Sequence, residues 1–257
     1  MRVRMVLIMI LAASLLLTAS AFALPGTVPA TAFVSRSVAF SGYQWQVKES
    51  RVPIGPMANL FGGSAKSVSV NRSGSLIMRI IKIKNSWYAS EVGLDRSLGL
   101  GTYTLRLRGF VNRFDPNVIL GIFTWDNEPE EAHRELDIEF SEWGGYTTPD
   151  NAQFVVQPWD EKLNLHRFRF DQASADFSCS IEWKPGRAYF SLWDGHGPRP
   201  SPGASSLYRE WTRTGSLIPS PGMERFRINF YLNDGASPKD GKAAEIAMTA
   251  FSFEPHH

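Results

Sequence analysis

Three carboxylic acids alternate with three apolar residues over residues 135–140 of this 257-residue chain. The acids are Glu135, Asp137 and Glu139, and the apolar residues are Leu136, Ile138 and Phe140. A period of two is typical of a half-buried β-strand, and it places the acids on one face and the apolar residues on the other. Because neighbouring negative charges repel each other, a strand that serves only folding has little reason to carry three of them on one face.

Such a row of carboxyl groups suits the hydrolysis of a glycosidic bond, in which one carboxylate is the nucleophile or base and a protonated one donates to the leaving oxygen. The charge of Asp137 is expected to raise the proton affinity of at least one flanking glutamate. The Cα atoms of Glu135 and Glu139 lie about 13 Å apart on a strand, so their side chains must lean together to reach the separation of about 5–5.5 Å seen in retaining enzymes. The inverting separation of about 6.5–9.5 Å fits nearly as well. An exposed acidic face and a calcium site are the alternative interpretations.

The segment from Glu135 to Phe140 resembles the Glu-x-Asp-x-Glu active-site strand of glycoside hydrolase family 16, which includes licheninases, laminarinases, agarases and xyloglucan endotransglucosylases. The single residue between Asp137 and Glu139 is similar to the licheninase and xyloglucan branches. The resemblance implies that Glu135 is the nucleophile, Glu139 the acid/base and Asp137 the residue that orients both, with retention of configuration. No cofactor is needed for this chemistry, although relatives often carry a structural calcium ion; no EF-hand-like spacing is present here.

A weaker resemblance covers residues 36–254. Residues 101–103 resemble the Gly-Thr-Tyr entry to one of the family's early strands. Residues 227–233 lie where relatives often have an Asn-Leu-Trp strand. Tyr231 and Leu232 replace that pattern here, which puts the usual aromatic contact in doubt.

A polysaccharide site also needs flat apolar platforms for sugar rings and amide groups for hydroxyls. Trp125 and Trp143 flank the acidic strand and are the leading stacking candidates, with core packing as the alternative. Gln153 and Gln157 share one face of the following segment, so both side chains could enter the same groove, and Asn151 lies beside them. An ordinary solvated face is the alternative interpretation of these amides.

Short alternating segments separated by turn residues follow one another along the chain. They are 38–48, 66–70, 75–82, 86–92, 102–110, 117–125, 134–141, 152–158, 165–170, 176–183, 187–193, 225–232 and 244–253. About a dozen strands without long helices predict one all-β domain over residues 37–257, an antiparallel β-sandwich. The family resemblance makes it a jelly roll of the concanavalin A-like type. Residues 198–220, rich in Pro, Gly, Ser and Arg, are expected to form a long loop.

The first residues have the features of a secretory signal peptide. A basic start, an apolar run from Met5 to Leu17 and the small-x-small sequence of residues 21–23 predict a signal peptide over residues 1–23, with an uncleaved anchor as the alternative. Residues 24–36 are expected to be a flexible leader. These features predict a secreted or periplasmic protein without a stable membrane anchor. Removal of residues 1–23 lowers the formal charge from +2 to 0, which gives no reason to expect nucleic acid as a partner.

Cys179 is the only cysteine, so no intrachain disulfide can form, and its place in an alternating segment predicts a core residue. Together these features predict a secreted, retaining endo-acting hydrolase of a β-linked polysaccharide, with glucans favoured and a monomer expected. A transglycosylase of the same family and a carbohydrate-binding protein without turnover are the alternatives. A third is an exported structural domain with calcium at the acids.

Overall fold

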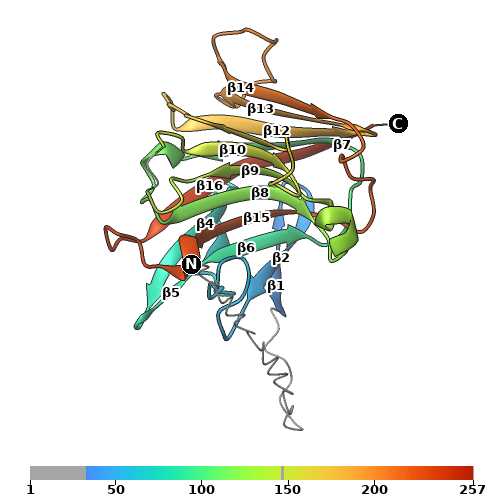
Figure 1. Ribbon diagram of the computed structural model, residues 1–257. Helices are drawn as coiled ribbons and strands as arrows, with labels where there is room; N and C mark the ends of the chain where they lie inside the picture. The colour runs from blue at the N-terminus through green and yellow to red at the C-terminus, as the bar shows by residue number, and fades with distance from the viewer. Residues whose placement is uncertain (1–32, 146–147, 257) are drawn as a thin grey trace, which may run out of the picture.

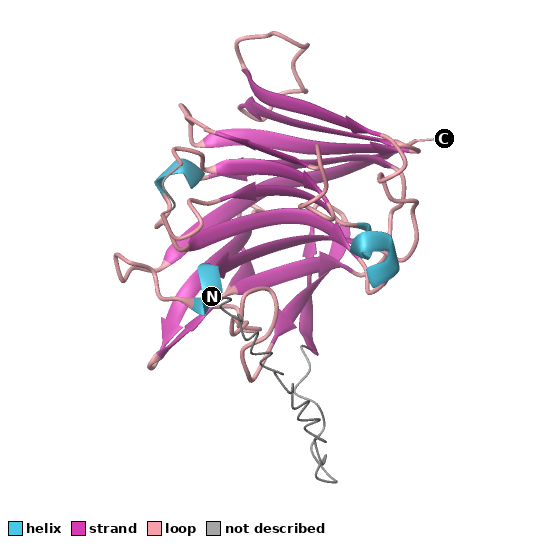
Figure 2. Ribbon diagram, viewed as in Figure 1, coloured by secondary structure: helices cyan, strands magenta, loops and turns pink. Residues whose placement is uncertain are grey.

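The computed structural model describes residues 33–145 and 148–256, whose strands form two stacked antiparallel sheets (Figures 1 and 2). The first sheet has the strand order β1 (Phe33–Phe40), β2 (Tyr43–Glu49), β6 (Ser90–Leu94), β15 (Arg225–Leu232), β8 (Val118–Trp125), β9 (Leu136–Phe140), β10 (Ala152–Val156) and β11 (Leu165–Phe168). The second has the order β14 (Leu207–Thr214), β13 (Arg187–Asp194), β12 (Asp176–Lys184), β7 (Gly101–Arg108), β16 (Ala244–Pro255), β4 (Leu76–Ile83) and β3 (Val68–Val70), with β5 (Ser86–Tyr88) paired to β4. The predicted antiparallel β-sandwich is confirmed.

Short 3-10 turns lie between some of these strands: η1 (Val111–Arg113), η2 (Pro129–Arg134) and η3 (Asn233–Gly235). Within the described ranges, no helix has the length and apolar character needed to cross a membrane. The predicted signal peptide of residues 1–23, and the first part of the predicted leader, lie outside the described residues.

The end of the predicted leader is part of a strand. β1 begins at Phe33, so residues 33–36 pair with β2 and are not a free leader, which corrects the expected boundary. The guanidinium of Arg36 donates to the carbonyl oxygen of Gly63 at 2.8 Å and to that of Val68. Long-range contacts of this kind, which composition does not reveal, attach the segment to the sandwich.

The predicted loop over residues 198–220 contains a strand, which is a second correction. β14 pairs with β13 at the edge of the second sheet, with a shift in register near its start, and most of its residues are half-buried. On the inner side the Trp211 ring packs against Phe190, with ring centroids 5.3 Å apart. The edge position leaves β14 half-buried, so arginine, glutamate and threonine are tolerated there and the alternation is hard to see in the sequence.

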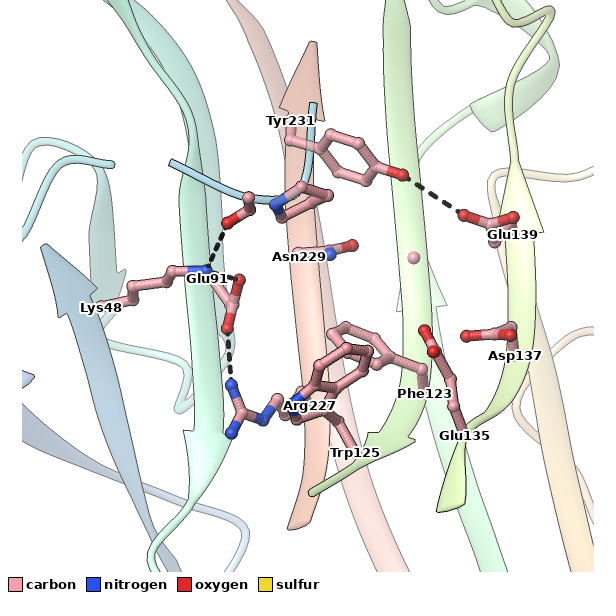
Figure 3. A pocket seen from close by; sticks show the side chains of 13 residues that line it. Lys48, Glu91, Phe123, Trp125, Glu135, Asp137, Glu139, Arg227, Asn229 and Tyr231 are labelled. Carbon is pink, nitrogen blue, oxygen red and sulfur yellow. Dashed lines mark hydrogen bonds and ion pairs between the residues drawn. The ribbon is translucent and has the colours of Figure 1, made fainter. Parts of the chain in front are cut away.

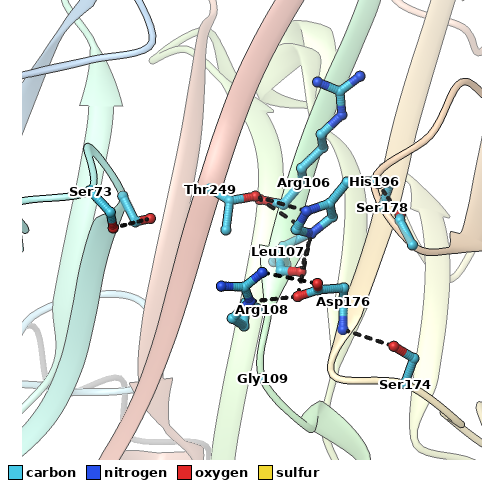
Figure 4. Close-up of polar contacts among 12 residues, drawn as sticks. Ser73, Arg106, Leu107, Arg108, Gly109, Ser174, Asp176, Ser178, His196 and Thr249 are labelled. Atoms are coloured by element: carbon cyan, nitrogen blue, oxygen red, sulfur yellow. Dashed lines mark hydrogen bonds and ion pairs between the residues drawn. The ribbon is translucent and has the colours of Figure 1, made fainter.

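Polar contacts also cover part of the outward face of the second sheet (Figure 4). Arg108 of β7 donates to both carboxylate oxygens of Asp176 on β12, at 2.6 and 3.0 Å. His196 Nε2 donates to the carbonyl oxygen of Leu107 at 2.8 Å. These contacts hold the turn after β13 against the sheet. The side chains of Arg108, Asp176 and His196 are therefore bound to protein groups.

The core lies between the two sheets and fixes the orientation of β9. Leu136, Ile138 and Phe140 are each at most 1% exposed and belong to one cluster with residues of both sheets. Because successive side chains on a strand point to opposite faces, their burial turns Glu135, Asp137 and Glu139 to the outward face of the first sheet.

Cys179 is 1% exposed within this core, as predicted, and burial raises the pKa of its thiol. We expect Cys179→Ser to lower the free energy of unfolding by about 2 kcal/mol, because a hydroxyl is placed among apolar groups. Cys179→Ala loses only packing contacts and should cost about 1 kcal/mol. Urea unfolding at neutral pH measures both; a serine variant as stable as the alanine variant would contradict an apolar environment.

Candidate active site

Asp137 and Glu139 of β9, with Glu135 immediately before the strand, line a pocket of about 290 Å³ on the outward face of the first sheet (Figure 3). Its walls come from β2, β6, β15, β8 and β9 and from the segment that follows β2. The lining residues are Lys48, Gly55, Pro56, Glu91, Gly121, Phe123, Trp125, Glu135, Asp137, Glu139, Arg227, Asn229 and Tyr231. The structure therefore brings the three predicted catalytic residues together in one concave site.

Strand register places a row of residues across the floor of this pocket. Gly121 of β8 lies between Glu139 of β9 and Asn229 of β15, and Glu91 of β6 follows Asn229. A Cβ atom at Gly121 would lie 2.3 Å from Asn229 Oδ1, so only glycine leaves room for the amide. Asn229 Oδ1 is buried without a hydrogen-bond partner in the described structure, which leaves an acceptor free opposite Glu139.

Both carboxyl oxygens of Glu139 are held by neighbouring strands. Tyr231 Oη donates to Oε1 at 3.3 Å, and Gln153 Nε2 donates to Oε2. Arg167 in turn donates to Gln153 Oε1 from Nε and Nη2, at 2.9 and 2.6 Å. The arginine fixes which end of the amide faces Glu139, so the carboxyl group is oriented from two sides.

Burial dominates the protonation of all three acids. Asp137 is only 4% exposed, and its burial, with the charges of Glu135 and Glu139, raises its pKa well above the ordinary value. Burial also raises the pKa of Glu135, against the effect of a hydrogen bond with Asp137. It raises the pKa of Glu139 too, although donation from Gln153 and Tyr231 partly offsets this. The site therefore retains protons at a pH where isolated carboxyls are charged, as a general acid requires.

The two predicted stacking tryptophans have different environments. Trp125 lines the pocket, and the His133 ring stacks on it with centroids 4.0 Å apart and planes 9° apart. Trp143 is 8% exposed, packs against Phe61, Ala89, Ile119 and Tyr231, and lies under the Arg167 guanidinium at 4.3 Å. Its ring is used in packing, so the structure corrects the prediction that Trp143 is a sugar platform.

The predicted amides bind protein groups. Gln153 holds Glu139, and Gln157 Nε2 donates to Asp137 Oδ2 at 3.3 Å, so both support the acids from β10 or just after it. Asn151 is a correction: its Oδ1 accepts from the Phe170 backbone N–H at 2.7 Å and its Nδ2 donates to the Phe170 carbonyl at 3.2 Å. Both of its polar groups are thus used away from the pocket.

The sequence predictions omitted five polar or charged residues of the pocket. These are Lys48, Glu91, Arg227, Asn229 and Tyr231. Arg227, Asn229 and Tyr231 alternate along β15, so the period of two could have identified them as one face. The sequence pattern does not show that β15 pairs with β8, so it could not place this face beside the acids.

The acidic groups that the structure describes near the rim of the pocket do not form a cluster that could bind a metal ion. Asp126 is buried, forms an ion pair with Arg134 and accepts from the Glu128 backbone N–H at 2.9 Å. Over residues 33–145 and 148–256, no group of three or more His, Cys, Asp or Glu side chains is arranged to hold a metal ion. A structural calcium ion stays a prediction.

Solved structures with a similar fold include several glucanases. A Bacillus licheniformis β-glucanase is 17% identical over 82% of this chain and 92% of that chain, with a TM-score of 0.57. A glycoside hydrolase family 16 endo-glucanase from Bacteroides ovatus is 10% identical over 82% and 94% of the two chains, with a TM-score of 0.59. A Mycobacterium tuberculosis protein described as a pseudo β-1,3-glucanase is 19% identical over 83% and 91%, also at 0.59.

The chain has the fold of these β-glucanases. No protein-family model and no curated protein matches the sequence. At such low identities the likeness extends to the β-glucanase fold alone, and function must be argued from the residues of the pocket.

We expect Asp137→Asn to stabilise the protein, and more so as the pH rises from 4 to 8. The pKa of Asp137 is raised in the folded state, so the folded protein holds its proton more tightly than the unfolded chain does. Between the unfolded and folded pKa values this carboxyl destabilises the folded state increasingly with pH. Asparagine removes that penalty and keeps a donor toward Glu135. The expected gain at pH 8 exceeds about 1 kcal/mol.

Chemical unfolding of the wild type and variant at pH 4, 6 and 8 measures this effect. Asp160→Asn, at an exposed position, is the matched control and should change stability little at any of these pH values. A loss of stability at pH 8 in Asp137→Asn would contradict the protonation argument.

Proposed function

We propose that the protein is a retaining endo-β-glycan hydrolase, exported by its predicted signal peptide, that cleaves a β-linked polysaccharide with glucans favoured. The observation that carries the proposal is the convergence of Glu135, Asp137 and Glu139 in one pocket, with protein donors directed at two of them. The glucanases that share the fold support it.

In the first step Glu135 attacks the anomeric carbon as its carboxylate, while the carboxylic acid of Glu139 gives its proton to the leaving glycosidic oxygen. Glu135 then holds the sugar as an ester. Asp137 hydrogen-bonds Glu135 and so orients the nucleophile and stabilises its charge before attack.

In the second step Glu139, now a carboxylate, removes a proton from water, and the water oxygen attacks the anomeric carbon and releases Glu135. Conversion of Glu135 to an ester has removed a negative charge from the row, which lowers the proton affinity of the remaining acids. The hydrogen bonds from Tyr231 and Gln153 stabilise the Glu139 carboxylate at this stage. If a sugar hydroxyl replaces water, the same steps give transglycosylation.

The amide of Asn229 and the ring of Trp125 would position the sugar. Asn229 offers an unpartnered acceptor across Gly121 from the acid/base, and Trp125 offers an aromatic surface beside Glu135. Binding through these two groups combines a hydrogen bond with apolar contact, as carbohydrate sites require.

Removal of either glutamate should abolish most turnover. We expect Glu139→Gln to lower kcat by roughly 10²–10⁴-fold, the range for loss of a general acid, and Glu135→Gln to lower it at least as much because the covalent step is lost. New reducing ends from mixed-linkage glucan, laminarin, xyloglucan and agarose measure the effect, and NMR of the first-formed product gives its anomeric configuration.

Glu130→Gln is the matched control, because it removes an exposed acid a few residues away on η2. Its activity should equal that of the wild type. Equal turnover by all four proteins, or inversion at the anomeric carbon, would contradict the proposed roles. Glycan binding without new reducing ends would identify a carbohydrate-binding protein instead.

A further inference from the structure

The wall of the pocket opposite the acids carries a group of charged side chains from β2, β6 and β15. Glu91 of β6 is 3% exposed and is contacted by two cations. Lys48 Nζ lies 2.7 Å from one carboxylate oxygen, and Arg227 Nη1 lies 3.2 Å from the other. Figure 3 shows Glu91 between these two cations. Two positive charges share one negative charge.

Arg227 is built into the sheet with hydrogen-bonding capacity to spare. Its aliphatic stem passes over Gly93, where a Cβ atom would lie 3.2 Å from Arg227 Cγ. Its Nε is buried and has no hydrogen-bond partner in the described structure. Apart from the bond to Glu91, the guanidinium makes no hydrogen bond to a protein acceptor among the described residues, so its other donors face the pocket. Its charge also acts on Glu135 across the pocket and opposes the rise in the pKa of that carboxyl.

Arg225 extends the positive wall along the same face of β15. It lines an adjoining pocket of about 340 Å³, which shares Trp125 and Arg227 with the first one. Its Nη1 donates to the neutral Gln46 at 2.8 Å. Asp126 and Glu128 also line this second pocket, and Asp126 is paired with Arg134. The three cations Lys48, Arg225 and Arg227 are then opposed by two acids, Glu91 and the exposed Glu128. The wall therefore has an excess of positive charge.

A neutral sugar would satisfy this wall poorly. A hydroxyl group accepts a hydrogen bond from a guanidinium but brings no negative charge. Glu91 would then remain shared between Lys48 and Arg227, and Arg225 would keep the neutral Gln46 as its partner. A carboxylate or a sulfate offers several oxygens that match the fork of a guanidinium, and it neutralises the charge. Gly55 and Pro56 border this side of the pocket, where Lys48 Nζ donates to the Gly55 carbonyl at 2.9 Å.

We propose that Arg227, supported by Arg225 and Lys48, forms a subsite for a sugar that carries an oxyanion, either a carboxylate or a sulfate ester. This inference rests on the proposed function and narrows its substrate class to acidic β-glycans. Arg227 lies in register with Phe123 of β8, which in turn pairs with Asp137, so the charged group binds on the β15 side of the reacting bond.

The test compares three forms of the same two polysaccharides. Mixed-linkage glucan and laminarin are used in neutral form, after oxidation of the C6 hydroxyl to a carboxylate, and after sulfation. kcat/KM is measured for the wild type, Arg227→Gln, Arg227→Lys and the control Arg96→Gln, which removes a positive charge at an exposed position after β6. Binding is measured separately by calorimetry. Oligosaccharides of each form are titrated into the Glu139→Gln protein and into Glu139→Gln proteins that also carry Arg227→Gln, Arg227→Lys or Arg96→Gln.

At least one charged form should be favoured over the neutral form by about tenfold or more, the value of a charge-assisted contact. Arg227→Gln should remove most of this preference, Arg227→Lys should retain part of it, and Arg96→Gln should leave it unchanged. The oxidised and sulfated arms show which oxyanion is taken. The preference should decrease with added salt.

The subsite would be overturned if the wild type had an equal or higher kcat/KM on the neutral forms than on the charged forms. It would also be overturned if Arg227→Gln lowered kcat/KM by the same factor on all forms. The calorimetry separates this result from failure of the proposed function. If the protein binds the charged forms more tightly but cleaves none of them, the subsite stands and the hydrolase is rejected. If the protein cleaves the polysaccharides without preferring the charged forms, the hydrolase stands and the subsite is rejected. Absence of binding to every form overturns both.

Discussion

The pocket depends on holding three mutually repelling carboxyl groups on one face of the extended segment formed by Glu135 and β9. The alternating apolar side chains provide the opposing force, because each of them is buried between the sheets and contributes about 1.5–3 kcal/mol by leaving water. Neither set can change face without the other, since a shift of one residue in register would bury the acids and expose Leu136, Ile138 and Phe140. The chemistry of the outward face is therefore fixed by packing on the inward face.

The repulsion among the acids is relieved by donors from several strands. Gln153 of β10 and Tyr231 of β15 contact Glu139, and Gln157 contacts Asp137. β15 and β10 lie on opposite sides of the β8–β9 pair, so the electrostatics of the row depend on the pairing of these four strands. Gly121 of β8 contributes by having no side chain. The space that a Cβ atom would fill is occupied by the amide of Asn229, which therefore lies opposite the acids.

Local patterns were sufficient to predict the acidic strand, the orientation of its acids and the sandwich class, because a period of two is a property of neighbouring residues. They failed where the outcome depends on which strands become neighbours. Trp143 and Asn151 are close to the acids in sequence, but one packs under Arg167 and the other binds the backbone of Phe170. Tyr231 is 92 residues from Glu139 and contacts it directly. β14 was missed because an edge strand needs little apolar content.

The position of β15 has a consequence for how the molecule is assembled during synthesis. This strand comes from residues 225–232, yet it lies in the middle of the first sheet, between β6 and β8. Until it emerges from the ribosome, the facing edges of β6 and β8 lack their partner, and exposed strand edges favour association with other chains. A nascent chain that already contains all three acids still lacks one wall of the pocket, so competence for ligand binding arises only after residues 225–232 have been synthesised.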